Sequence, residues 1–167
     1  LAGLGNVIWM LSAQFLGWQV LDFVLLLPIL VFAWMSARRL HLMGGFDGTW
    51  RRLNASLLTG LFSGWIAVAV SISVPATYRA LAGLGPTDTV WVSLWLALLS
   101  AGGLAWFFAS RISASIVFFL ALAWGLTGVA TNNWYMTGMH WLTVVTCLVG
   151  AFILWRRVRH GARPALQ

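Results

Sequence analysis

Residues 53–74 read LNASLLTGLFSGWIAVAVSISV and contain no charged side chain. A helix of about 20 apolar residues crosses the roughly 30 Å of hydrocarbon in a bilayer, so this stretch is long enough to span a membrane. Within it, Gly60 and Gly64 form a GxxxG pattern. Such a pattern clears one helix face for the close approach of another helix. The sequence therefore predicts that these two glycines mediate helix packing.

Four further apolar stretches of similar length lie on either side of this one. Together they predict five spans, at about residues 17–35, 53–74, 90–108, 112–130 and 139–155. The composition agrees, because 61% of the 167 residues are hydrophobic and only 8% are charged, whereas soluble domains are about one quarter charged. The expected fold is an all-α, polytopic integral membrane helix bundle that forms a single transmembrane domain.

The arginines fall almost entirely on one side of these five spans. Nine share that side, namely Arg38, Arg39, Arg51, Arg52, Arg111, Arg156, Arg157, Arg159 and Arg163, and Arg79 alone lies on the other. By the positive-inside rule, this distribution places the C-terminus in the cytoplasm and the start of the first span outside. The clustered arginines, which are all of the nine except Arg111 and Arg163, are suited to docking anionic lipid or a partner protein.

The net charge of +7 would suggest nucleic-acid binding in a soluble protein. Membrane topology accounts for the charge here, so no nucleic-acid partner is expected. We expect the chain to reside in the inner membrane of a bacterium. Residues 1–16 are interpreted as a helix lying at the outer membrane surface. An extension of the first span and a short sixth span are the alternatives for this segment, and a sixth span would move the N-terminus inside.

The residue types that support catalysis are scarce. The chain has no Lys and no Glu, its only acids are Asp22, Asp47 and Asp88, and its only cysteine is Cys147. Schiff-base chemistry needs a lysine, hydrolysis by paired carboxylates needs two neighbouring acids, and dithiol redox chemistry needs a second cysteine. The sequence therefore predicts no catalytic residues and no metal site, and a non-enzymatic role.

Tryptophan and a few polar residues are the candidates for ligand binding. Most of the twelve tryptophans, Trp34 among them, lie near predicted span ends, as expected for interfacial aromatic belts. Trp65 and Trp124 lie near mid-span, where an indole either packs in the bundle or faces an apolar ring ligand. Asp22 in the first span and His140 at the start of the fifth would form an acid–base pair if the fold brought them together.

One short segment resembles a known family. Phe107, Phe108, Arg111, Ala114 and Trp124 resemble the third-to-fourth helix region of the translocator family of tryptophan-rich sensory proteins. The resemblance implies five helices, an N-terminus outside and a pocket for an apolar ring. The Trp- and Pro-rich segment that joins the first two helices of that family is absent, and an arginine-rich loop takes its place.

A second segment, MHWLT at residues 139–143, resembles the start of a haem-bearing helix in membrane cytochrome b subunits. This resemblance implies that His140 binds haem, which requires a second axial ligand at the same depth. His41 is predicted on the opposite side of the membrane.

The sequence points first to a non-enzymatic subunit or auxiliary protein of a larger, energy-converting membrane complex. Its expected partners are membrane lipids and other membrane protein subunits. One alternative is a sensor that binds a porphyrin, carotenoid, quinone or lipid near Trp65 and Trp124. The other is a haem-bearing electron-transfer subunit that uses His140. The cofactor stays open among haem, a pigment and a quinone.

Overall fold

The computed structural model describes residues 1–43, 49–85, 88–113, 115–135, 138 and 140–159, and this part of the chain is all-α. Its six α-helices are α1 (Ala2–Phe15), α2 (Gln19–Leu42), α3 (Thr49–Ala82), α4 (Val90–Phe107), α5 (Ile116–Tyr135) and α6 (His140–Arg159). A π-helical turn, η1 (Phe108–Ile112), continues α4. The predicted all-α class is confirmed.

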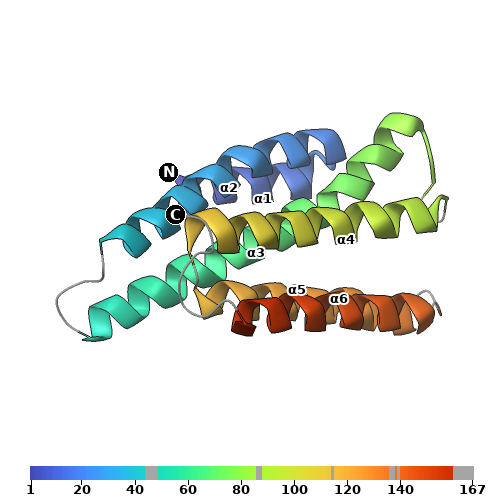
Figure 1. Cartoon of the computed structure of the whole chain (residues 1–167). Helices are drawn as coiled ribbons and strands as arrows, with labels where there is room; N and C mark the ends of the chain where they lie inside the picture. Colours follow the sequence, from blue (N-terminus) through green and yellow to red (C-terminus); the bar gives the residue numbers. More distant parts are fainter. Residues whose placement is uncertain (44–48, 86–87, 114, 136–137, 139, 160–167) are drawn as a thin grey trace.

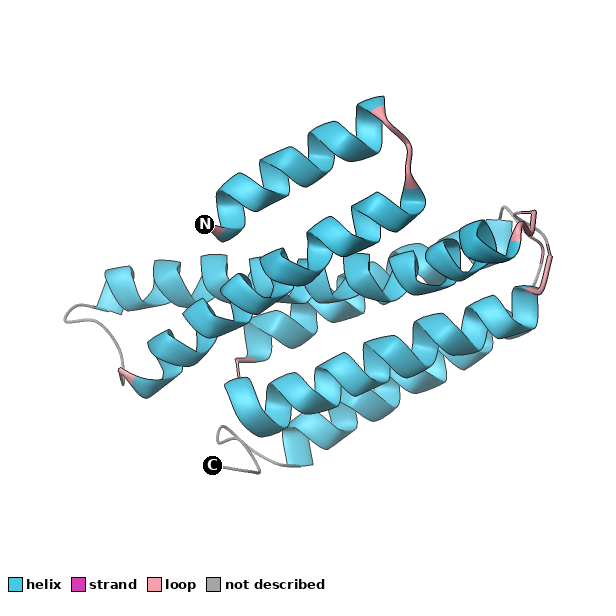
Figure 2. Ribbon diagram, turned by 90° about the horizontal axis from the view of Figure 1, so that it is seen from above, coloured by secondary structure: helices cyan, strands magenta, loops and turns pink. Residues whose placement is uncertain are grey.

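Helices α1 to α4 pack side by side in chain order, α5 packs against α3 and α6, and the helices alternate in direction (Figures 1 and 2). At one end of the bundle α2, η1 and α6 end and α3 begins, and we call this the arginine-rich end. At the opposite end α2, α4 and α6 begin (Figure 1). Because two chain reversals separate them, α3 and α5 run in the same direction. Helix α3 is central, since it packs against α2, α4 and α5.

Glycines bring α3 and α5 into close contact. A Cβ atom added at Gly64 would lie 2.5 Å from the carbonyl oxygen of Phe118, and one added at Gly60 would lie 2.8 Å from Cβ of Val117. On the facing helix, a Cβ at Gly125 would lie 2.5 Å from Cγ2 of Val68. The two backbones thus approach more closely than any residue with a side chain at these positions would permit.

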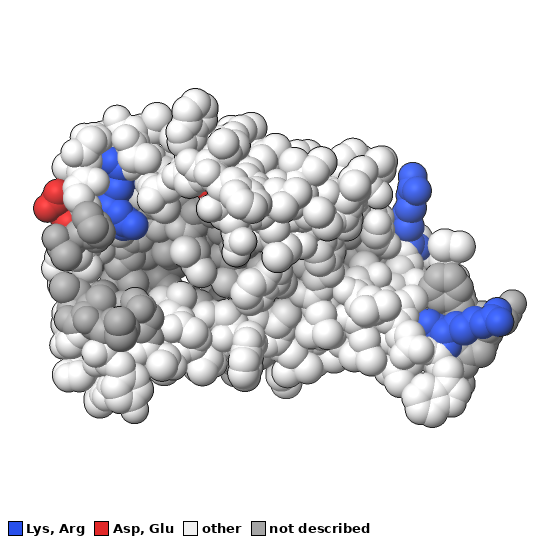
Figure 3. All heavy atoms as spheres, turned by 180° about the vertical axis from the view of Figure 1, so that it is seen from behind, with Lys and Arg blue, Asp and Glu red and all other residues white. Residues whose placement is uncertain are grey.

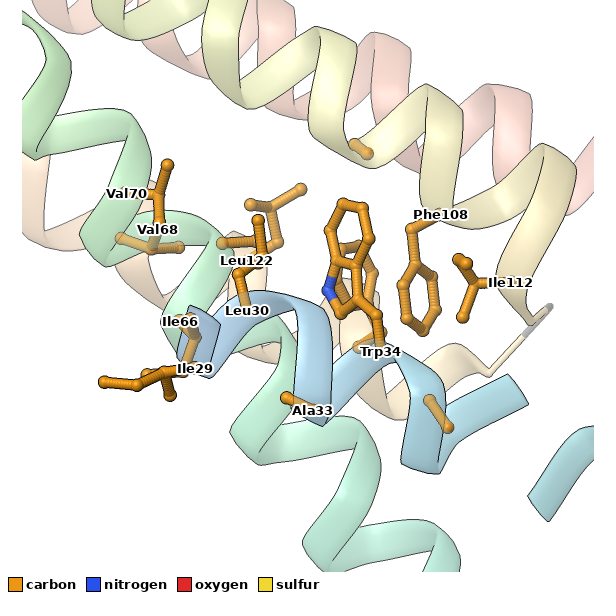
Figure 4. Packing of buried hydrophobic residues seen from close by; sticks show 14 of the residues in the cluster. Ile29, Leu30, Ala33, Trp34, Ile66, Val68, Val70, Phe108, Ile112 and Leu122 are labelled. Carbon is orange, nitrogen blue, oxygen red and sulfur yellow. The ribbon is translucent and has the colours of Figure 1, made fainter. Parts of the chain in front are cut away.

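Apolar side chains of α2, α3, η1 and α5, together with Ala105 of α4, form the main core (Figure 4). Its largest fully buried side chains are Leu26, Ile66, Phe108, Phe118 and Leu122. A smaller cluster joins α4 to α6, where Leu94 and Leu98 pack against Trp141 and Val145. The core therefore centres on α3, and α6 is attached at its periphery.

Three helices are long and apolar enough to cross a membrane, where the sequence predicted five. They are Gln19–Leu42, Leu53–Ala82 and Val90–Ile112, with 24, 30 and 23 residues. The predicted spans 112–130 and 139–155 do not qualify among the described residues. The apolar part of α5 covers only Ile116–Thr131, and α6 begins at His140 and ends in an arginine-rich turn. The three long helices indicate an integral membrane protein.

Helix α1 runs antiparallel along α2 (Figure 2). A Cβ added at Gly5 would lie 2.9 Å from Cγ1 of Ile29, and Ser12 Oγ donates a hydrogen bond to Asp22 Oδ1 at 2.9 Å. Early α1 thus packs beside the middle of α2. The placement of residues 1–16 at the membrane surface stays a prediction.

The charged side chains gather at the two ends of the bundle. Figure 3 shows arginines at both ends with a broad, largely uncharged surface between them. Arg38, Arg39 and Arg51 are exposed near the arginine-rich end, whereas Arg79 lies toward the end of α3 at the opposite side of the bundle. Burying a charge in hydrocarbon is costly, so this distribution fits a bundle whose middle lies in lipid.

Replacing Gly64 with Ala should weaken the bundle because the new methyl group meets the backbone of α5. Overpacking of this kind costs about 1–3 kcal/mol. We expect Gly64→Ala to lower the Tm of the detergent-solubilised protein, measured by far-UV circular dichroism. Gly103→Ala is the matched control, because a Cβ at Gly103 meets nothing within 4 Å. Equal Tm values for the two variants would contradict the proposed contact.

Candidate functional site

The most enclosed aromatic group in the described structure surrounds Trp34 of α2, whose side chain is only 7% exposed. Its ring stacks on Phe107 at 5.8 Å between centroids and meets Phe108 edge-on at 5.6 Å. Phe118 of α5 lies 6.5 Å away and stacks on Phe108 at 3.7 Å. Trp34 therefore joins α2, η1 and α5 in the core (Figure 4), and its predicted place in an interfacial aromatic belt is wrong.

The indole N–H of Trp34 is buried and has no hydrogen-bond partner in the described structure. A buried donor of this kind normally finds an acceptor, and leaving it unpaired costs about 1–3 kcal/mol. The sequence could not single out Trp34, because nearly every neighbour in α2 is apolar and no periodicity marks the buried face.

The π-helical turn η1 sets the position of the aromatic cluster. The Ser113 N–H donates to the Phe108 carbonyl at 3.0 Å, which is the i→i+5 bond of a π-helix. This wider turn leaves Phe108 fully buried while Arg111 stays exposed. Single π-helical turns occur frequently at functional sites. The predicted spans 90–108 and 112–130 left only residues 109–111 between them, and the sequence gave no sign of this geometry.

Trp65 and Trp124 lie on the outer surface, with 49% and 74% of their side chains exposed. Each is adjacent in sequence to a glycine of the α3–α5 contact. One residue along an α-helix is a turn of about 100°. Because α3 and α5 run in parallel, the residue after Gly64 and the residue before Gly125 turn toward the same side of the contact. The two indoles therefore project from one outer face, which we call the α3–α5 outer face.

Asp22 and His140 have different partners in the structure. Asp22 is partly buried and accepts the hydrogen bond from Ser12 of α1. The ring of His140 is exposed and lies 4.0 Å from the ring of Trp134, between centroids. Helix α6 packs on α4 and α5, whereas Asp22 faces α1. The described contacts thus place the two groups of the predicted acid–base pair on different helix pairs.

No group of three or more His, Cys, Asp or Glu residues that could hold a metal ion occurs among the described residues. His41 is near the end of α2, at the arginine-rich end, and His140 begins α6 at the opposite end. These two histidines are therefore too far apart along the bundle to share one haem. Cys147 is exposed on α6.

The predicted docking arginines lie at or near helix ends. Arg38, Arg39, Arg51 and Arg159 are exposed, and the guanidinium carbon of Arg159 lies 5.5 Å from the ring centroid of Trp155. Arg52, Arg156 and Arg157 belong to α3 and α6, but their side chains lie outside the described ones. At the opposite end, Arg79 donates to Ser93 Oγ at 2.8 Å, which links α3 to α4.

No protein-family model matches the chain, and neither a curated protein nor a solved structure is significantly similar to it. The functional argument therefore rests on the residues described above.

Removing the unpaired N–H of Trp34 should cost far less than removing its ring. We expect Trp34→Phe to destabilise the protein by less than about 1.5 kcal/mol, because it keeps an aromatic ring in the cluster. Trp34→Ala leaves a cavity and should cost about 3–5 kcal/mol. Denaturant titration followed by circular dichroism compares the two. Equal losses would mean that the N–H, and not the ring, stabilises the cluster.

Proposed function

We propose that the protein is an integral membrane subunit or auxiliary protein that docks on a transmembrane helix of a partner through α4. The main support is a gap on the surface of α4, where two consecutive residues have no side chain and no neighbouring helix fills the space. Gly102 and Gly103 follow one another within the helix, and a Cβ atom at either would meet nothing within 4 Å. Elsewhere in the bundle, a neighbouring helix occupies the space beside the glycines at 60, 64 and 125.

Large side chains border this gap on the same face of α4. Trp95, Leu99 and Trp106 are exposed to 50%, 67% and 47%. Leu99 follows Trp95 by four residues, and Trp106 follows Leu99 by seven, so that the two glycines lie between Leu99 and Trp106. Small residues flanked by large ones let a second helix approach closely and pack between them. In lipid, such packing is one of the few driving forces for helix association. The occupant that fits best is a partner's transmembrane helix.

The arginine-rich end is proposed to face the cytoplasm of a bacterium, with the bundle in the inner membrane. The exposed arginines at 38, 39, 51 and 159 support this orientation through the positive-inside rule. The same side chains are suited to anionic lipid headgroups, which gather at cytoplasmic surfaces. A larger, energy-converting complex is the class of partner that we propose. No catalytic role is proposed, in keeping with the scarcity of catalytic residue types.

A second candidate function is the binding of an apolar ring compound on the α3–α5 outer face. The specific support is the placement of Trp65 and Trp124 on one side of the contact, where their indoles present flat apolar surfaces. Gly128 lies one helical turn beyond Trp124 and also has open space at its Cβ position. A porphyrin, carotenoid or quinone would lie over this face in the lipid layer.

Substituting leucine at one glycine of each face separates the two functions. Gly103→Leu fills the gap on α4 and should abolish co-purification of partner polypeptides from the native membrane after mild solubilisation. Gly128→Leu is the matched control, because it adds the same side chain in equally open space on α5. The control should retain the partners.

The ring-binding function predicts a different pattern for these two variants. Gly128→Leu would then lose a compound that absorbs in the visible or near-ultraviolet range, and Gly103→Leu would keep it. Partner polypeptides that co-purify equally with Gly103→Leu and with wild type would contradict docking through α4.

A further inference from the structure

Helix α1 presents polar groups to the interior of the bundle. The residues of α1 that are buried or partly buried lie three or four apart on the face that packs against α2, and they are Ala2, Gly5, Asn6, Trp9 and Ser12. Three of the five carry a polar side-chain atom. Most faces that pack in a membrane bundle are apolar or small, because an unpaired polar group in hydrocarbon is costly.

Two of these polar groups have no hydrogen-bond partner in the part of the chain that the structure describes. Oδ1 of Asn6 and Nε1 of Trp9 are both buried and unpaired. The amide nitrogen of Asn6 has only a long contact of 3.7 Å to Sδ of Met10, and sulfur is a weak acceptor. An acceptor and a donor, one helical turn apart on the same face, thus both lack a protein partner.

Several other buried hydroxyl groups donate to backbone carbonyls. Ser71 donates to the Ala67 carbonyl of its own helix at 2.7 Å, and Ser63 donates to the Ala33 carbonyl of α2 at 3.4 Å. A carbonyl within reach thus satisfies these hydroxyl groups. Asn6 and Trp9 differ from them, and among the described residues they share the lack of a partner with the indole N–H of Trp34.

The polar groups lead to the carboxylate of Asp22. Asn6, Trp9 and Ser12 follow one another at three-residue steps, each about 4.5 Å along the helix, and Ser12 donates to Asp22 Oδ1 at 2.9 Å. No titratable side chain of α1 faces Asp22. On α3, Arg79 donates a hydrogen bond to Ser93, and Tyr78 is exposed. Asp88, which precedes α4, accepts a hydrogen bond from the Gly85 N–H. The described partner of Asp22 is therefore a hydroxyl group and not a cation.

We propose that the contact between α1 and α2 holds a short file of water molecules that connects Asn6 and Trp9 to Asp22, and that Asp22 binds a proton delivered through it. Water both donates and accepts, so one species satisfies the amide oxygen and the indole N–H. A hydronium ion in the file transfers its proton to the Asp22 carboxylate, which leaves water and a neutral carboxyl group. Release follows the reverse path, with no change in oxidation state.

Infrared spectroscopy of the full chain in lipid nanodiscs tests this proposal. The wild type should show a protonated-carboxyl stretching band that shifts rapidly in D₂O. Asp22→Asn should abolish this band, whereas Asp88→Asn should retain it. If Asp22→Asn does not fold, Ser12→Ala serves instead, because loss of the Ser12 hydrogen bond should shift the same band without removing it.

A second variant pair tests the water file. Asn6→Leu combined with Trp9→Phe removes both unpaired groups, and we expect it to abolish the fast exchange of the Asp22 band in D₂O. Gln14→Leu is the matched control, since Gln14 is exposed on the other side of α1, and it should leave the exchange fast. The proposal is overturned if the wild type shows no carboxyl band that depends on Asp22, or if the double variant exchanges as fast as the control.

Discussion

The close contact between α3 and α5 is the constraint on which the rest of the bundle depends. Gly60 and Gly64 on one helix and Gly125 on the other remove the side chains that would hold the two backbones apart. Helix α3 can then pack against α2, α4 and α5 at once, and the aromatic rings at the arginine-rich end close around Trp34. The same contact turns Trp65 and Trp124 outward. One packing interaction thus decides which aromatic residues form the core and which form the surface.

In the apolar middle of the bundle, each polar group needs a hydrogen-bond partner. Charges are confined to the bundle ends, and most inner hydroxyls bond to their own helix, because neither lipid nor core offers them water. Asn6, Trp9 and Asp22 depart from this pattern on one helix contact. The gap at Gly102 and Gly103 departs from close packing on α4. The proposed water file therefore rests on polar groups that lack partners, and the proposed docking face rests on glycines that no neighbouring helix covers.

The sequence predicted much of the fold and little of the site. Long uncharged stretches and arginine clusters were enough for the all-α class and for α2, α3 and α4, because hydropathy and charge act locally. Three helices, and not the predicted five, qualify as spans among the described residues, since the apolar part of α5 there covers only Ile116–Thr131 and α6 ends in an arginine-rich turn. Trp34 was placed at the interface, because burial depends on which face of a uniformly apolar helix meets its neighbours. The π-helical turn and the pairing of α1 with α2 arise from tertiary contacts that no local pattern records.

The most direct test of the central claim, a membrane subunit that works in a larger assembly, is a native mass spectrum of the protein extracted from its own membrane in the mildest effective detergent. The account predicts a mass well above the 18.3 kDa of the chain, with different polypeptides released on activation. A monomer or homo-oligomer with no other polypeptide would contradict it. In that case a bound mass of a few hundred daltons would identify the protein as a ligand binder instead.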